Sequence, residues 1–281
     1  MTEVKDEDGN TSYEFKDKLG QVVLTRQINE GVNYDTYYVC NDFGNLCYVL
    51  PPLMGDNISQ DNLNKYAYLY KYDERNRCIW KKLPGCEPVY YIYDKADRLI
   101  LSQDGEQRAK EEWYLTLPDI FGRVVLTGMY LDNIPQDKYW EHFKDKIITG
   151  VYGLNFWGGY GLQINGVNYF PKRIKTYTIN YYDNYDFLAL PGFKNYNLEY
   201  KTSGIETDYL KRYGDNNPDN KYKHKGLLTG TQTVLLNGKE YDTSTIYTYA
   251  VMYYDNKKRL IQSKSTNHLN GMEEEYIAYN F

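Results

Sequence analysis

Four aspartates share a local setting that could supply paired carboxylates for acid and base catalysis. Each directly follows a tyrosine, and the four are Asp73, Asp94, Asp183 and Asp255. A pair of such carboxylates is what glycoside hydrolysis uses. A carboxylate at the start of a turn, however, also accepts hydrogen bonds from backbone N–H groups two residues further on. The turn role explains all four residues, so we predict that none of them is catalytic.

Other residue types that carry chemistry are scattered along the chain. The three histidines are isolated at His142, His224 and His268, and the four cysteines form no CxxC pair. His142 falls on a predicted helix, where packing is the expected role. The glycine-rich segment 158–161 lacks the strand, lysine and helix of a phosphate-binding loop. We therefore predict no metal site, no cofactor and no enzymatic activity.

Composition points to a β-rich protein. The 281 residues include 34 tyrosines against 9 phenylalanines and 4 tryptophans, and tyrosine favours half-buried strand positions. The formal charge of -5 offers no positive field for a nucleic-acid backbone, so no nucleic-acid partner is expected. The uncharged run 147–171 is interrupted by glycine and by polar amides, so we expect no membrane span.

A seven-residue motif recurs along the chain, and its copies align without gaps. Its consensus is Tyr-Asp-x-x-Gly-Arg-Leu. The copies span residues 16–22, 40–46, 72–78, 93–99, 118–124, 182–188 and 254–260. Apolar runs flank the copies, which predicts that each copy is the turn of a β-hairpin.

Two positions of the motif carry the turn chemistry. Position two is always Asp or Asn, which caps the turn. Position five is Gly, Asn or Asp in every copy except one, where Lys258 stands, and these residues tolerate a left-handed backbone. These preferences predict a three-residue loop, a type I turn followed by a G1 bulge. The predicted turn residues are Asp17, Gly20, Asn41, Gly44, Asp73, Asn76, Asp94, Asp97, Asp119, Gly122, Asp183, Asp186 and Asp255.

The loop also predicts which residues face each other across the hairpin. It pairs the residue before the Asp with the residue two after position five. One sheet face then collects mostly aliphatic side chains, and the other collects a ladder of tyrosines. Under this register Val39 faces Cys47, so the sulfurs of Cys40 and Cys47 lie on opposite faces as free thiols. For Cys78 and Cys86 the sequence leaves both alternatives open, a disulfide bridge or two free thiols.

Shorter signals fill the segments between the copies. Asn165-Gly166 and Asn237-Gly238 predict two-residue type I′ hairpins. A short helix is predicted over 207–213, and the polar stretch 213–225 predicts a solvated loop. No linker is evident, so we predict a single all-β array over residues 1–281.

One longer helix is predicted to interrupt the array as an insertion at about 133–147. The helix itself should span 135–147, with Pro135 at its first position, because proline is favoured there. Trp140, Phe143 and Ile147 should lie on one face.

The repeat resembles the YD-repeat of RHS-type proteins, which is named for its Tyr-Asp pair. That pair stands in Tyr72-Asp73, Tyr93-Asp94, Tyr182-Asp183 and Tyr254-Asp255. The sequences of Tyr37–Gly44, and of Lys82–Gly85 before the next copy, are similar to segments of the large RHS-repeat proteins of Bacteroidetes. The resemblance implies a long strip of β-hairpins that spirals into a hollow shell, in a secreted or cell-surface protein. In some members of the family the shell encloses a variable C-terminal effector.

The chain also departs from the family pattern. It contains no Asp-Pro, so the Asp-Pro-x-Gly signature of the core that closes the shell, with its self-cleavage site, cannot be carried over. The segment 1–12 lacks the apolar region of a secretory signal. Tyr279-Asn280 occupies the Tyr-Asp positions of a further copy, and we expect 275–281 to form an unprotected edge strand that seeks a partner.

These observations favour a non-enzymatic structural segment that forms a scaffold or an encapsulating shell. Its partners would be further repeats or a core domain of the same polypeptide, an enclosed effector, or a surface glycan. The alternative is a carbohydrate-binding module, in which Trp157 and Tyr160 would stack on sugars. A hydrolase is a second and less favoured alternative.

Overall fold

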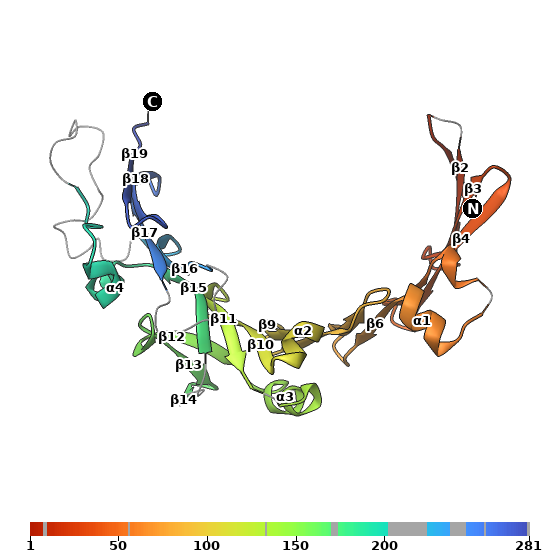
Figure 1. Ribbon diagram of the computed structural model, residues 1–281, viewed down its shortest axis with the longest axis horizontal. Helices are drawn as coiled ribbons and strands as arrows, with labels where there is room; N and C mark the ends of the chain where they lie inside the picture. The colour runs from red at the N-terminus through yellow and green to blue at the C-terminus, as the bar shows by residue number, and fades with distance from the viewer. Residues whose placement is uncertain are drawn as a thin grey trace. The chain divides into compact units, whose positions relative to one another are not determined.

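The computed structural model describes residues 1–7, 10–55, 57–132, 134–169, 174–201, 224–236, 246–255 and 257–279 (Figure 1). The chain divides into two compact units. Unit 1 comprises Met1–Trp113 with Asn133–Lys144, and unit 2 comprises Tyr114–Asp132 with Asp145–Phe281. Among the described residues, no helix is long and apolar enough to cross a membrane.

Both units consist mainly of antiparallel strands, which confirms the all-β prediction. Sixteen described strands form one hydrogen-bonded series in sequence order, except that β15 follows β11. The series begins with β1 (Thr2–Lys5), β2 (Thr11–Lys16), β3 (Val22–Asn29), β4 (Val32–Cys40), β5 (Leu46–Leu50), β6 (Tyr68–Tyr72), β7 (Cys78–Lys82), β8 (Val89–Tyr93) and β9 (Leu99–Gln103). It continues with β10 (Glu112–Pro118), β11 (Val124–Leu131), β15 (Ile174–Tyr182), β16 (Leu228–Val234), β17 (Tyr247–Tyr254), β18 (Leu260–Thr266) and β19 (Met272–Tyr276).

The connections hold a second small sheet and several short helices. The second sheet contains β12 (Ile148–Trp157), β13 (Tyr160–Ile164) and β14 (Val167–Tyr169). The α-helices are α1 (Gln60–Tyr66), α2 (Gly105–Ala109), α3 (Gln136–Phe143) and α4 (Pro191–Lys194). The 3-10 helices are η1 (Pro52–Met54) and η2 (Asp186–Ala189).

Six copies of the motif form the same turn. At position five, φ is 83° at Gly20, 82° at Gly44, 60° at Asn76, 61° at Asp97, 83° at Gly122 and 62° at Lys258. In the copy at 93–99, the N–H of Asp94 donates to the carbonyl of Arg98 at 3.0 Å. The N–H of Asp97 donates to the carbonyl of Asp94 at 3.1 Å. The loop is therefore a type I turn that ends in a left-handed residue.

The copy at 182–188 is not a contiguous turn, and this prediction was wrong. Asp186 begins η2, whereas the positive φ of 74° belongs to Asp183. The N–H of Asp183 donates to the carbonyl of Leu227 at 3.1 Å, and Gly226, with a φ of 86°, donates its N–H to the Asp183 carboxylate at 2.7 Å. Residues 184–223 are thus inserted between the two halves of one turn, which an alignment without gaps cannot show.

Capping contacts of the same kind occur at two places outside the seven copies. Asn267 accepts from the N–H groups of Leu269 and Gly271, and Asn270 has a φ of 60°. Asp6 accepts from the N–H of Asn10 at 2.8 Å and donates its own N–H to the Asn10 carbonyl. Both lack the Tyr-Asp pair and the arginine, so they differ from the consensus at the positions that identify it.

The register across each turn is shifted by its bulge. Cys40 pairs with Leu46, but Val39 pairs with Tyr48 and not with Cys47. The predicted pairing of Val39 was wrong because the bulge takes up one residue after position seven. All four cysteines are free thiols in the structure.

Several predictions for the connections can be compared with the structure. Asn165-Gly166 has φ values of 50° and 78°, which confirms the type I′ turn between β13 and β14. Asn237-Gly238, the helix over 207–213 and the loop up to residue 223 lie outside the described residues.

The longer helix is shorter than predicted. It begins after Pro135, which is its N-cap, and ends at Phe143. Tyr139 and Phe143 form its buried face in unit 1, while Ile147 lies beyond its end. The ring of Tyr139 packs edge-on against buried Trp113, with centroids 5.2 Å apart. The predicted face of Trp140, Phe143 and Ile147 missed Tyr139. It was drawn for a helix that continues to Ile147, whereas the helix ends at Phe143.

The segment that follows Asp183, residues 184–201, covers one face of the unit 2 sheet. Phe187 stacks on Tyr181 with centroids 4.4 Å apart, and Phe193 packs edge-on against Tyr249. A Cβ at Gly230 would lie 2.3 Å from the Phe187 ring, so this strand position must be glycine. Leu198 accepts a hydrogen bond from Tyr253, which is fully buried. This face is aromatic as well as aliphatic.

The strand at the end of the described series differs from the prediction. It is β19, which begins at Met272, and its pairing with β18 extends to Tyr276 and Gln262. Glu273, Glu274 and Glu275 lie on it, all of them exposed. The strand expected over 275–281 was therefore placed wrongly, because β19 lies earlier and carries three glutamates; that its outer edge seeks a partner stays a prediction.

The left-handed turn position gives a direct stability test. Gly122→Ala should lower the free energy of unfolding by about 1 to 2 kcal/mol, because a Cβ is strained at a φ of 83°. No atom lies within 4 Å of that Cβ, so backbone strain alone is measured. Urea unfolding provides the measurement.

Gly122→Asn is the matched control, because asparagine already occupies this conformation at Asn76 and should cost much less. Lys258→Gly should stabilise slightly for the same reason. Gly105 is unsuitable as a control, since its Cβ would lie 2.4 Å from Glu87. Equal losses for Gly122→Ala and Gly122→Asn would contradict the backbone explanation.

Candidate functional site

The carboxylate at motif position two organises each turn. In the copy at 93–99, Oδ1 of Asp94 accepts from the N–H groups of Ala96 at 2.9 Å and Arg98 at 3.0 Å, and Oδ2 accepts from Nε of Arg98 at 3.0 Å. The Asp94 side chain is completely buried. The same pair of backbone contacts recurs at Asp17, Asn41, Asp73, Asp119 and Asp255. These residues therefore cap turns, as position two requires.

The arginine at position six neutralises the carboxylate of its own copy. Its Nε donates to Oδ2 of the aspartate four residues earlier, at 2.7 to 3.0 Å. The pairs are Arg77 with Asp73, Arg98 with Asp94, Arg123 with Asp119 and Arg259 with Asp255. The four aspartates are at most 10% exposed, so an unpaired charge there would be costly.

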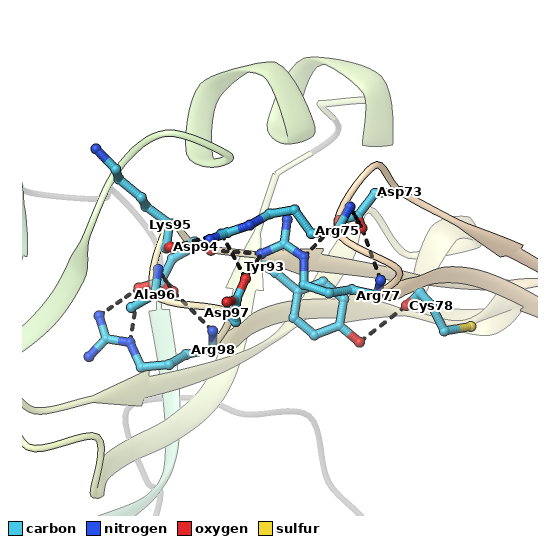
Figure 2. Close-up of polar contacts among 10 residues, drawn as sticks. All are labelled: Asp73, Arg75, Arg77, Cys78, Tyr93, Asp94, Lys95, Ala96, Asp97 and Arg98. Carbon is cyan, nitrogen blue, oxygen red and sulfur yellow. Dashed lines mark hydrogen bonds and ion pairs between the residues drawn. The ribbon is translucent and has the colours of Figure 1, made fainter. Parts of the chain in front are cut away.

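The same arginine also reaches the next copy (Figure 2). Nη1 of Arg77 donates to the carbonyl of Asp94 at 2.9 Å and to the Asp97 carboxylate at 2.8 Å. Arg75 supports this contact by donating to the carbonyl of Lys95 at 2.9 Å. One side chain thus closes its own turn and binds the following one.

The tyrosine at position one makes a second contact between neighbouring copies. Its hydroxyl donates to the carbonyl at position seven of the preceding copy. The pairs are Tyr72 with Leu46 (2.9 Å), Tyr93 with Cys78 (3.1 Å), Tyr182 with Val124 (3.5 Å), Tyr254 with Leu228 (2.7 Å) and Tyr279 with Leu260 (2.9 Å). Tyr279 thus makes the contact of a position-one tyrosine, while Asn280 lies outside the described residues.

The tyrosine ring lies beneath the arginine of the preceding copy. The guanidinium of Arg77 is 5.0 Å from the centre of the Tyr93 ring. The corresponding distances are 4.4 Å for Arg123 over Tyr182 and 4.5 Å for Arg259 over Tyr279. We call this set, the aspartate and arginine of one copy with the tyrosine of the next, the joint.

One joint of unit 2, that of Arg123, bridges two carboxylates. Nη1 and Nη2 of Arg123 donate to Asp183 at 3.0 and 2.7 Å, while Nε donates to Asp119 at 2.7 Å. These contacts, led by the hydrogen bond to Asp183, raise the pKa of Arg123. The same hydrogen bond lowers the pKa of Asp183, whose own position six is occupied by Leu227. The split turn therefore takes its arginine from the preceding copy.

The hydrogen-bonding capacity of these carboxylates is used within the turns. Asp73, Asp94, Asp119 and Asp255 each accept backbone N–H groups on one oxygen and a guanidinium on the other. Within the described residues, no group of three histidine, cysteine or acidic side chains is arranged to hold a metal ion.

One residue of the pair considered for sugar stacking, Tyr160, is buried. Tyr160 is only 6% exposed and packs against Tyr152 and Tyr181, with centroids 5.3 and 5.9 Å apart. Burial raises its pKa. Trp157 is half-buried beside Phe156. The proposed role of Tyr160 was wrong, because the small sheet packs it inside unit 2.

Sequence reasoning missed the roles of the tyrosine and the arginine. Both residues are part of the consensus, and their recurrence was the sign in the sequence that they have a role. Their partners, however, lie in a neighbouring copy, for example 17 residues from Arg77 to Asp94. The spacing within one motif gives no information on such contacts.

The similarity of the chain to known proteins is weak. No protein-family profile matches the chain, and no curated protein matches it. Among solved structures, the chain is similar to one in the Photorhabdus luminescens Tc holotoxin pore and to one in the complex TcdB2-TccC3-Cdc42. Each match has 11% identity and a TM-score of 0.37, and covers 95% or 94% of this chain but 12% of that chain. A likeness at this TM-score carries no argument about fold or function.

The tyrosine hydroxyl of the joint can be tested alone. Tyr93→Phe should lower the free energy of unfolding by about 1 kcal/mol, because the carbonyl of Cys78 loses its donor while the ring stays in place. Tyr91→Phe is the matched control two residues earlier on the same face of the strand, and it should have little effect. Urea unfolding monitors both variants, and an equal effect of the two would contradict the role of the joint.

The joint of Arg123 with Asp183 should respond to acid. A carboxylate with a lowered pKa stabilises the fold above its unfolded pKa, near 4, and this stabilisation is lost as the pH falls through the folded value. Asp183→Asn should therefore be less stable than the natural chain at pH 7, with the difference shrinking towards pH 2. Chemical unfolding across this range provides the measurement, and a difference that is independent of pH would exclude the ion pair as its cause.

Proposed function

We propose that this chain is a structural segment of a YD/RHS-type repeat protein, in which hairpins joined in series form the wall of a scaffold or an encapsulating shell. The joint carries this proposal. It uses three residues that define the repeat, Tyr, Asp and Arg, to bind a hairpin to its neighbour where all three are present, as at Asp73, Arg77 and Tyr93. The motif residues therefore hold adjacent hairpins together, as expected in a repeat architecture in which each unit contacts its neighbours.

The proposal includes the wider setting of the chain. The single array over residues 1–281 would continue into further repeats or a core domain of the same polypeptide, and an effector would be the enclosed cargo. Secretion or display at the cell surface belongs to the same proposal, as does the absence of enzymatic activity. The resemblance of the Tyr-Asp copies to RHS-type proteins supports these points.

Limited proteolysis of the whole natural polypeptide tests the wall. Arg77→Met removes the guanidinium that holds Asp73 and reaches Asp94, so it should open the wall at this joint. Lys95→Met, which replaces an exposed cation in the next turn whose side chain takes no part in the joint, is the control. We expect Arg77→Met to expose cleavage sites in segments outside this chain, at least about tenfold faster than the control. Faster cleavage confined to residues 1–281 would contradict an enclosing role.

A further inference from the structure

Part of one edge of β4 in unit 1 has no neighbouring strand. On one side, β3 pairs with β4 from Val32 to Tyr37. On the other side, β5 pairs with β4 only from Tyr37 to Cys40. In the described part of the chain, no strand pairs with residues 32–36 on the β5 side. We call residues 32–36 on this side the open edge.

The open edge presents backbone hydrogen-bonding groups at alternate residues. Glu30-Gly31, with φ values of 47° and 77°, forms a type I′ turn, so Asn29 and Val32 are a hydrogen-bonded pair of the β3–β4 ladder. Residues that bond to β3 then recur at every second position of β4. The N–H and C=O groups of Asn33 and Asp35 therefore point away from β3, towards the β5 side. These are the groups that a further strand would bond.

Two prolines explain why β5 does not cover the open edge. Leu50, the last residue of β5, pairs with Tyr37, and Pro51 and Pro52 follow it directly. Proline has no N–H group, so it cannot continue the ladder. The chain instead turns into η1, where the carbonyl of Pro51 accepts from the N–H of Met54 at 2.9 Å. The β4–β5 ladder thus ends while β4 continues.

A groove with a volume of about 510 Å³ lies beside the open edge, which is within the range of ligand-binding sites. Asn33 and Asp35 line one side of it. The other side is an apolar wall formed by Pro51, Pro52 and Ile58. Because this wall lies opposite the edge, the groove has room for one extended strand but not for two paired strands. A second copy of β4 would bring its own β3 with it, so a lone strand of another polypeptide fits better.

The open edge lacks the features that usually protect a strand edge from pairing. Residues 32–36 include no lysine and no proline. Their one charged residue is Asp35, and Nε and Nη2 of Arg26 donate to its two oxygens, each at 2.7 Å. The charge of Asp35 is therefore neutralised from β3 and does not repel an incoming strand. Val32 and Tyr34 are 53% and 43% exposed, so apolar surface is left for a partner to cover.

We propose that an extended segment of a separate polypeptide adds to the open edge as an antiparallel strand and continues the ladder of β5. Its backbone groups bond the N–H and C=O groups of Asn33 and Asp35. Its side chains opposite these two residues contact the apolar wall and are therefore apolar, while the alternate side chains are polar.

Charge complementarity defines one end of this segment. An antiparallel strand in line with β5 ends near Val32, next to the exposed Glu30. A lysine or arginine at the C-terminal end of the segment therefore complements the edge. The inference is independent of the structural role proposed above, because the open edge uses none of the residues of the joints.

Titration of the whole chain with an acetylated peptide tests the proposal. The probe alternates threonine and valine over about seven residues and ends in lysine. We expect saturable binding with a Kd of about 1 mM or tighter, and weaker binding of the same peptide ending in glutamate. No saturable binding up to about 10 mM, or preferred binding of the glutamate peptide, would overturn the proposal.

N-methylation of the probe separates strand addition from other modes of binding. The valines opposite Asn33 and Asp35 use their N–H groups in the ladder, so methylating the valine nitrogens should weaken binding by about tenfold or more. Methylating the threonine nitrogens is the matched control, because those groups point away from β4. Equal weakening by the two modifications would overturn the pairing.

Amide hydrogen exchange locates the added strand residue by residue. With the probe bound, the amides of Asn33 and Asp35 should exchange at least about tenfold more slowly, whereas those of Tyr34 and Thr36, which already bond to β3, should not change. Unchanged exchange at Asn33 and Asp35 would overturn the assignment. Slow exchange at these two residues without the probe, increasing with protein concentration, would mean that a second copy occupies the edge, and it would also overturn the proposal.

A backbone variant gives an independent check. Asn33→Pro removes one N–H group of the open edge without removing a bond to β3, and proline is tolerated at such an edge position. It should weaken binding of the probe by about tenfold or more, while Asn33→Ala, the matched control, should retain it, with similar thermal unfolding of both variants. Equal binding of the probe to the two variants would contradict strand addition.

Discussion

The buried carboxylate at motif position two is the constraint on which the rest of the structure depends. A carboxylate removed from water is destabilising unless it is fully hydrogen-bonded and paired with a cation. Two backbone N–H groups and one arginine meet this requirement at Asp73 and Asp94. Arginine has five donors in a rigid fork, so donors remain after its own aspartate is satisfied. The surplus donors bind the next copy, and local turn chemistry becomes a connection between hairpins.

The same constraint accounts for the irregular copy. Asp183 lacks an arginine of its own, because Leu227 occupies that position, and Arg123 of the preceding copy supplies both contacts. The turn stays closed although a long insertion leaves from its middle. The insertion in turn contributes Phe187, Phe193 and Leu198 to the core of unit 2. The segment that interrupts the repeat thus adds buried aromatic side chains to one face of the sheet.

The parts of the fold that could be predicted are those with short-range causes. The left-handed position at Gly44 or Asp97 follows from residue type alone, because few side chains tolerate that backbone. The Val39 pairing failed because the bulge shifts the register by one residue. The split turn at Asp183 depends on Gly226, which is distant in sequence, and one motif gives no signal for it. The contacts of Tyr93 were unpredictable for the same reason, although the tyrosine itself was conspicuous.

Native-state hydrogen exchange of an Arg77 variant tests the central claim most directly, namely that the joint couples neighbouring hairpins. Replacing Arg77 by methionine removes its contacts to Asp73 in its own turn and to Asp94 in the next. The account predicts that amide protection falls together in β6–β7 and in β8–β9, because both hairpins lose a shared side chain. Lost protection confined to β6–β7, with β8–β9 unchanged, would contradict it.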